Sequence, residues 1–161
     1  MASALKNLSD YSPLPTSFNP VNYKIGILIS EWNKEVTEAL FEGAFQTLTA
    51  EGVPEENIVK DYVPGSYELP LGAQIMMEKA QMDAVICLGC VIQGETRHFE
   101  FICQAVAKGI MDVNLKFSQP VIFGVLTTDN QEQALARAGG KLGNKGVEAA
   151  AAALKMLALA H

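Results

Sequence analysis

Short apolar runs alternate with longer segments of helical periodicity from Tyr23 to the end of the chain. Runs rich in β-branched residues predict four strands, over residues 23–30, 58–63, 83–92 and 120–126. Apolar side chains that recur every three or four residues predict helices over residues 34–50, 69–80, 99–117, 130–142 and 145–160. Because helices separate the strands, we expect the strands to be parallel and joined by right-handed crossovers.

The run from Ala84 to Ile92 is apolar almost throughout, as in strands that are covered on both faces. We therefore expect an α/β fold: a three-layer, flavodoxin-like sandwich with helices on both faces of a four-stranded parallel sheet. Residues 1–20 carry three prolines among small polar residues and are predicted to form an extended N-terminal arm. Residues 21–161 are expected to form a single domain, and the arm of the same or a neighbouring chain could cover a sheet edge.

The last predicted helix, over residues 145–160, carries apolar side chains around most of its circumference. A helix with so little polar face is usually buried on several sides. In a domain of this size, such burial favours contact with another copy, so we expect a homo-oligomer.

Composition restricts the class of protein. A chain of 161 residues with 49% apolar and 19% charged residues is typical of one globular domain. Its net charge of −6 argues against nucleic acid or an anionic membrane as a partner. We see no apolar segment typical of a signal peptide or a membrane span. The three cysteines are expected to be reduced thiols, which favours a cytoplasmic protein.

Ligands of open parallel sheets bind beyond the carboxyl ends of the strands, so the loops there are where we expect chemistry. The first loop contains Trp32, which is either a core aromatic or a flat platform for a planar ring. Asn33 beside it is interpreted as a helix N-cap, with hydrogen bonding to a ligand as the alternative. In the second loop, Gly65 allows the backbone to approach a ligand closely. Glu68 there either complements a helix N-terminus or accepts hydrogen bonds from sugar hydroxyls.

The third loop, Gln93 to His98, combines a glycine, a hydroxyl and an imidazole at the start of a helix. Glu95 and Thr96 would lie where backbone N–H groups and the helix dipole favour an anion. His98 is either a proton carrier or a solvated surface histidine. Further along, Arg137, Lys141 and Lys145 flank glycines that interrupt a helix. Arg137 could bind a phosphate there with two parallel hydrogen bonds.

The sequence offers little support for a metal. Cys87 and Cys90 have zinc-like spacing, but residues three apart in a strand point to opposite faces of the sheet. His98 and Glu100 match only the first half of a zinc-deaminase motif. We predict no metal.

Taken together, these loops make the chain resemble the 6,7-dimethyl-8-ribityllumazine synthase family. The matching segments are Glu31–Asn33, Val63–Pro70, Gly89–Phe101, Pro120–Thr127 and Glu132–Gly146, and they occur in the family's order and spacing. The resemblance implies a transferase of riboflavin biosynthesis that acts without a cofactor. Its substrates would be 5-amino-6-(D-ribitylamino)uracil and 3,4-dihydroxy-2-butanone 4-phosphate, condensed through a Schiff base with loss of phosphate and water.

The resemblance also implies roles for individual residues. The catalytic proton carrier would be His98. The expected substrate-binding residues are Trp32 and Asn33 at the pyrimidine, Ser66, Tyr67 and Glu68 at the ribityl chain, the backbone of Cys90, Val91 and Ile92 at the pyrimidine edge, Glu95 and Thr96 at the phosphate, and Phe123, Arg137 and Lys145. Phe123 and Arg137 would come from an adjacent subunit of a pentamer or an icosahedral 60-mer. The family often has cations at the positions of Glu31 and Gln93, where this chain has none.

Two alternatives remain at this stage. A flavodoxin-like module could hold a flavin or a phosphate-bearing ligand without turnover. A receiver-type signalling domain would need a cluster of acids after the first strand, of which Glu31 and Asp61 are only a poor imitation.

Overall fold

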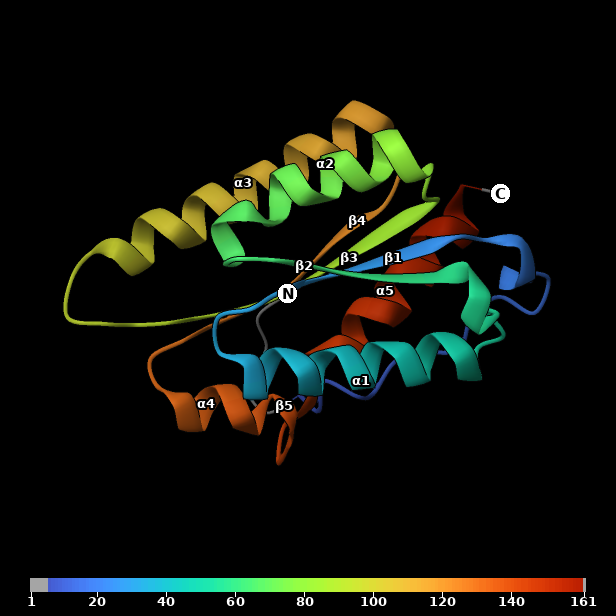
Figure 1. Ribbon diagram of the computed structural model, residues 1–161. Coiled ribbons are helices and arrows are strands. Elements are labelled where there is room, and N and C mark those ends of the chain that lie inside the picture. Colours follow the sequence, from blue (N-terminus) through green and yellow to red (C-terminus); the bar gives the residue numbers. More distant parts are fainter. Residues whose placement is uncertain (1–5, 161) are drawn as a thin grey trace.

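A four-stranded parallel sheet forms the centre of the computed structural model, which describes residues 6–160. The strands are β1 (Ile25–Ser30), β2 (Ile58–Val63), β3 (Ala84–Ile92) and β4 (Val121–Thr128), in the order β2-β1-β3-β4. Figure 1 shows α2 (Leu69–Ala80) and α3 (His98–Phe117) on one face of the sheet, and α1 (Lys34–Ala50) and α5 (Lys145–Leu159) on the other. The predicted three-layer, flavodoxin-like α/β fold is confirmed.

The helix predicted over residues 130–142 is wrong. The helix α4 (Gln131–Ala136) is short, and it is followed by a small antiparallel hairpin of β5 (Ala138–Gly140) and β6 (Gly143–Asn144). Gly139 and Gly143 have φ angles of 100° and 81°, a region that right-handed helices do not use. Glycine at these positions lets the chain turn back, which is why apolar spacing alone did not reveal the hairpin.

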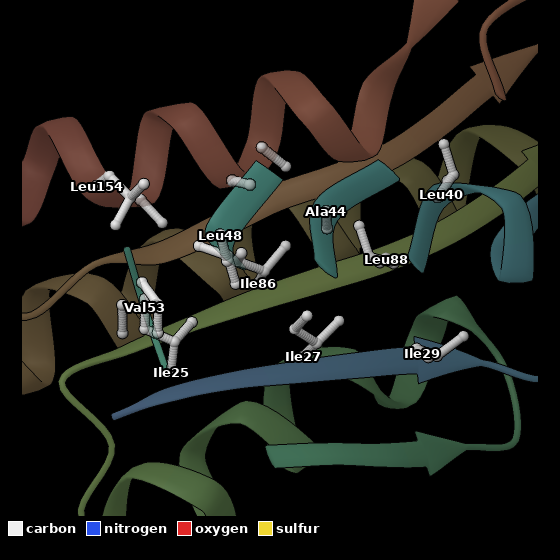
Figure 2. Close-up of a cluster of buried hydrophobic side chains, with 14 of the residues drawn as sticks. Ile25, Ile27, Ile29, Leu40, Ala44, Leu48, Val53, Ile86, Leu88 and Leu154 are labelled. Atoms are coloured by element: carbon white, nitrogen blue, oxygen red, sulfur yellow. The ribbon is translucent and has the colours of Figure 1, made fainter. Parts of the chain in front are cut away.

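Two apolar cores lie on the two faces of the sheet because side chains alternate along each strand. Ile25, Ile27 and Ile29 of β1 point toward α1 and α5, whereas Leu28 points toward α2 and α3. Figure 2 shows Ile25, Ile27 and Ile29 of β1 in one cluster with Leu40, Ala44 and Leu48 of α1. Full burial of one such side chain stabilises the fold by about 1.5–3 kcal/mol. These contacts hold the strand ends, and the loops that follow them, in fixed places.

The apolar helix α5 is covered mainly by its own chain. It packs on α1, β3 and β4 and buries Ala149, Ala153 and Leu154 completely or nearly so. The pattern from which we expected an oligomer interface is therefore explained within one subunit. Large apolar side chains are exposed instead on α2 and α3, where Leu71 and Leu115 are 63% and 72% exposed.

The N-terminal arm lies against its own chain from residue 6 onward, and its first five residues lie outside the described part. Tyr11 donates a hydrogen bond to Glu51 Oε1 at 2.7 Å, at the end of α1. Ser12 Oγ accepts one from Lys155 Nζ of α5 at 2.8 Å. The described arm thus covers helix ends and adds no strand to the sheet.

Candidate active site

One pocket opens at the carboxyl ends of β1 and β3, between the short 3-10 helix η3 (Ser66–Glu68) and the start of α3. It encloses about 750 Å³, a size typical of small-molecule sites. Its lining residues are Trp32, Asn33, Gly65, Ser66, Tyr67, Glu68, Cys90, Val91, Ile92, His98, Phe101 and Ile102. The fold thus brings together eight of the predicted binding residues and the predicted proton carrier, from three separate strand ends.

Exposed aromatic side chains surround this pocket. Trp32 is 73% exposed, Tyr67 59% and Phe101 68%. Trp32 is therefore no core aromatic, and its indole leans over Gly65, where a Cβ would lie 3.3 Å from Trp32 Cδ1. Aromatic rings that are left open beside a concave site provide flat surfaces for a planar ligand.

Asn33 occupies the N-cap position of α1, as interpreted, but its side chain makes no capping hydrogen bond. The residue adopts a left-handed conformation with a φ of 59°, and its Nδ2 donates to the carbonyl oxygen of Cys90 at 2.8 Å. The contact joins the loop after β1 to the end of β3, across a separation of 57 residues in sequence. Asn33 therefore shapes the pocket by holding two strand ends together.

The end of β3 leaves backbone groups open toward the pocket. The register pairs β1 with β3 only as far as Ile29 with Leu88, whereas β3 continues to Ile92 alongside β4. On the side of β1, the backbone groups of Cys90 and Ile92 consequently have no strand partner, and Asn33 Nδ2 binds the Cys90 carbonyl oxygen. Such groups can recognise the hydrogen-bonding edge of a heterocycle.

The loop before α2 presents a carboxylate and a hydroxyl to the pocket. Glu68 Oε2 accepts a hydrogen bond from the Gly65 N–H at 3.0 Å, which fixes the turn. Ser66 is buried, and its Oγ has no hydrogen-bond partner among the described residues. It sits above Gly89 of β3, where a Cβ would lie 2.5 Å from that Oγ. A buried hydroxyl that lines a pocket without a partner is suited to meet a polar ligand.

His98 begins α3 at the rim of the same pocket. Gln93 holds the loop that leads to it, because Gln93 Nε2 donates to the carbonyl oxygens of Gly94 at 2.7 Å and Thr96 at 3.3 Å. The His98 N–H donates to Thr96 Oγ1 at 3.4 Å. Glu95 and Thr96 are exposed beside the pocket but do not line it.

The two central cysteines are protected thiols. Burial raises the pKa of Cys87 to about 12 and that of Cys90 to about 11, so both stay protonated near neutral pH. Cys87 belongs to the core under α2 and α3, and Cys90 to the core on the other face. Within residues 6–160 we find no cluster of three or more metal-ligating side chains.

Phe123, Arg137 and Lys145 do not reach this pocket in one chain. Phe123 lies on β4 and packs partly buried in the core under α2 and α3. Arg137 follows α4, on the side of the sheet that carries α1 (Figure 1), and its Nη1 donates to the Gln133 carbonyl at 2.9 Å. Lys145 Nζ forms an ion pair with Glu148 at 2.9 Å.

The sequence analysis did not single out Phe101 and Ile102 as site residues. Both lie one turn after His98, and side chains three and four positions apart share a face of a helix. That spacing was the available signal, but the same periodicity also describes a core helix.

None of the helices within residues 6–160 is long and apolar enough to cross a membrane.

A doubly wound parallel sheet with a ligand-sized pocket at its strand ends defines an α/β protein that binds a small planar molecule. The family model described as 6,7-dimethyl-8-ribityllumazine synthase matches residues 22–161. The chain is 62% identical to the 6,7-dimethyl-8-ribityllumazine synthase of Cytophaga hutchinsonii, over 98% of both chains. It is 50% identical to the protein of the same name from Parabacteroides distasonis, again over 98% of both chains. The chain therefore belongs to the 6,7-dimethyl-8-ribityllumazine synthase family, and the resemblance noted in the sequence is confirmed.

Proposed function

We infer that this chain is a transferase of riboflavin biosynthesis that makes 6,7-dimethyl-8-ribityllumazine. It condenses 5-amino-6-(D-ribitylamino)uracil with 3,4-dihydroxy-2-butanone 4-phosphate and releases phosphate and water. The observation that carries this conclusion is the 62% identity to a named synthase over 98% of both chains. A flavodoxin-like module without turnover is not favoured, because relatives of 46–62% identity share the synthase name.

The pyrimidine ring binds against Trp32 in this proposal. The exposed indole provides the stacking surface, and the backbone groups of Ile92 on the side of β1 meet the polar edge of the ring. Asn33 supports the same edge from the loop after β1, together with the backbone of Cys90. These groups orient the amine of the first substrate toward the rim where His98 lies.

The ribityl chain lies along the loop before α2. Ser66 offers a buried hydroxyl without a partner, and Glu68 offers carboxylate oxygens that accept hydrogen bonds from sugar hydroxyls. Tyr67 covers the chain from its exposed position at the pocket. A polyol needs several such partners, because each unpaired polar group in a closed site costs free energy.

The phosphate of the second substrate is held at the start of α3 and by an adjacent copy of the chain. Glu95 and Thr96 bring backbone N–H groups to the helix terminus, where an anion is stabilised. The described lining of the pocket contains neither lysine nor arginine. A phosphate dianion needs cations, so Arg137 and Lys145 of a neighbour complete the site, with Phe123 of the neighbour closing it.

Such a shared site requires a homo-oligomer, a pentamer or an icosahedral 60-mer. The exposed apolar side chains of α2 and α3, among them Leu71, Met111 and Leu115, support a subunit contact on that face. We place the enzyme in the cytoplasm, in keeping with three free cysteines. Residues 21–161 form its catalytic domain and residues 1–20 its arm.

The chemistry follows from positioning and proton transfer. The amine attacks the ketone carbonyl, and loss of water gives a Schiff base; elimination of phosphate, ring closure and loss of a second water then give the product. Holding both reactants in place contributes up to about 7–11 kcal/mol to lowering the barrier. A placed acid–base group contributes about 10²–10⁴-fold, and His98 is the only imidazole among the described residues that line the pocket.

The test mixes the two substrates with the purified full-length protein and follows the lumazine chromophore while the particle mass is measured. We expect turnover without added metal or cofactor, from particles larger than one chain. Binding of the uracil substrate without any product would contradict the proposal and favour a binding module.

A further inference from the structure

The hairpin that follows Arg137 is fastened by the N-terminal arm. The Leu8 N–H donates to the carbonyl oxygen of Leu142 at 2.7 Å, and Ser9 Oγ accepts a hydrogen bond from the Asn144 N–H at 3.0 Å. The Ser9 N–H in turn donates to Asn7 Oδ1 at 2.9 Å, which fixes the local turn of the arm. Residues 7–9 therefore bind the hairpin at its turn and at its second strand, and we name these three residues the arm clamp.

The fit between the arm clamp and the hairpin is close. A Cβ at Gly143 would lie 2.6 Å from the Ser9 nitrogen and 2.8 Å from the Leu8 nitrogen. Gly143 also has a φ of 81°, which favours glycine. The arm backbone can approach this far only because residue 143 carries no side chain.

Asn144 joins the clamped hairpin to the body of the domain. Its Nδ2 donates to the Ala39 carbonyl of α1 at 2.9 Å, and its Oδ1 accepts from the Gly146 N–H of α5 at 2.8 Å. The backbone N–H of the same residue is the group that Ser9 holds. One residue thus connects the arm, the hairpin, α1 and α5.

The hairpin fixes the backbone from which both predicted phosphate-binding cations extend. The Lys145 N–H donates to the carbonyl oxygen of Arg137 at 2.8 Å. The Leu142 N–H donates to the Ala136 carbonyl at 2.9 Å. A shift of the hairpin would therefore move Arg137 and Lys145 together.

We propose that Ser9, through the arm clamp, is a positioning residue for the phosphate-bearing substrate. It holds the hairpin so that Arg137 meets the phosphate in a neighbouring pocket with the right geometry. The proposal rests on the proposed function, in which Arg137 binds that phosphate. Two-point binding by a guanidinium tolerates little displacement, so a small shift of the hairpin weakens it measurably.

The arm also supplies a matched control, because Tyr11 anchors the same segment at a different place. Its hydroxyl binds Glu51 at the end of α1, away from the hairpin. If the arm only added stability, loss of either anchor would act alike. If the arm clamp positions the hairpin, only the loss of the Ser9 hydroxyl changes substrate binding.

The experiment compares Ser9→Ala, Ser9→Thr and Tyr11→Phe in the full-length assembled protein. We expect Ser9→Ala to raise the KM for 3,4-dihydroxy-2-butanone 4-phosphate about 5- to 10-fold, the effect of one hydrogen bond. The KM for the uracil substrate and kcat should stay near the wild-type values. Ser9→Thr keeps a hydroxyl and should restore the lower KM, and Tyr11→Phe should leave both KM values unchanged.

Equal thermal shifts for Ser9→Ala and Tyr11→Phe, with both KM values unchanged, would overturn the proposal. A rise in KM that accompanies loss of assembly in Ser9→Ala would overturn it too, because the effect would then belong to the interface.

The KM of the variant Arg137→Ala shows whether a failure lies in the role of the arm clamp or in the proposed function. If Arg137→Ala leaves the KM for the phosphate substrate unchanged, the assigned role of Arg137 fails and the proposal fails with it. If it raises that KM and Ser9→Ala does not, only the arm clamp is wrong. Adding Ser9→Ala to Arg137→Ala should raise the KM by a smaller factor than Ser9→Ala does alone, because Arg137 is then absent and only Lys145 can still be displaced.

Discussion

In the proposed function, the pocket at α3 and the hairpin at α5 carry complementary parts of one site. The pocket holds exposed aromatic rings, an imidazole and a buried hydroxyl, but none of its described lining residues is a lysine or an arginine. The hairpin region holds Arg137 and Lys145 on the other side of the sheet, and neither residue lines the pocket. A substrate pair made of a neutral heterocycle and a phosphoester needs both regions, so a single chain presents two incomplete halves.

The pocket and the hairpin also differ in the contacts that hold them in place. The pocket is built on the ends of central strands, and Asn33 ties two of those ends together. The hairpin contributes little to either core and depends on backbone hydrogen bonds, glycine conformation and the arm clamp. Function in the second region should therefore respond to changes that barely affect the fold.

Replacing His98 should have the largest effect, because it removes the proton carrier of the pocket. We expect His98→Gln to lower kcat about 100-fold or more and to leave both KM values near the wild type. Steady-state rates of lumazine formation measure this. A fall in rate that disappears at saturating phosphate substrate would instead give His98 a binding role.

Mixing two defective variants tests whether the two regions work in different copies. His98→Gln keeps Arg137, and Arg137→Ala keeps His98, so a mixed particle contains some sites with both residues intact. If each site is shared between neighbours, random mixing gives about a quarter of the wild-type activity, since half of the pockets meet the right neighbour half of the time. Coexpression with two affinity tags isolates the mixed particles. Activity that stays at the level of the two parents would place both residues in one chain.

Replacing Trp32 should affect only the binding of the uracil substrate in the pocket. We expect Trp32→Ala to raise the KM for the uracil substrate about 3- to 10-fold, as for loss of one aromatic stack, and to leave the KM for the phosphate substrate unchanged. Trp32→Phe keeps a ring and should recover most of the affinity.

Fluorescence gives an independent reading, because Trp32 is the only tryptophan of the chain. The uracil substrate should quench it, and the phosphate substrate alone should not. Equal quenching by both would argue against stacking on the indole.

The sequence predicted the sheet well because its signals there are local and strong. The apolar run of β3 and the helical stripe of α1 are each decided by burial over many consecutive residues. The predicted helix over residues 130–142 failed because two positive-φ glycines outweigh the apolar spacing. No pattern in the sequence distinguishes a glycine that interrupts a helix from one that builds a hairpin.

The site was predicted less completely, since several of its features are contacts between distant segments. The contact between the Asn33 side chain and the Cys90 carbonyl could not be predicted from the sequence, because the two residues lie 57 positions apart. Ile102 has the spacing of a core residue, and it lines the pocket together with the exposed Phe101 because η3 and α3 leave that side open. The arm clamp joins Ser9 to Asn144, a pair 135 residues apart that no local signal connects.

The smallest expected effect concerns the anchor of the arm that lies away from the hairpin. The hydrogen bond to Glu51 raises the pKa of Tyr11 from 10.0 to about 12, with burial and the negative charge of Glu51 acting in the same direction. Because the pKa is raised in the folded state, the bond stabilises the fold fully below pH 10 and loses that contribution as the pH rises through about 12. Tyr11 is half-buried and water still screens the bond, so the contribution is small, about 1 kcal/mol or less. Denaturant unfolding of the wild type and Tyr11→Phe should show a stability difference at pH 8 that shrinks near pH 12. A difference that stays constant over this range would mean that the Tyr11 hydroxyl does not anchor the arm.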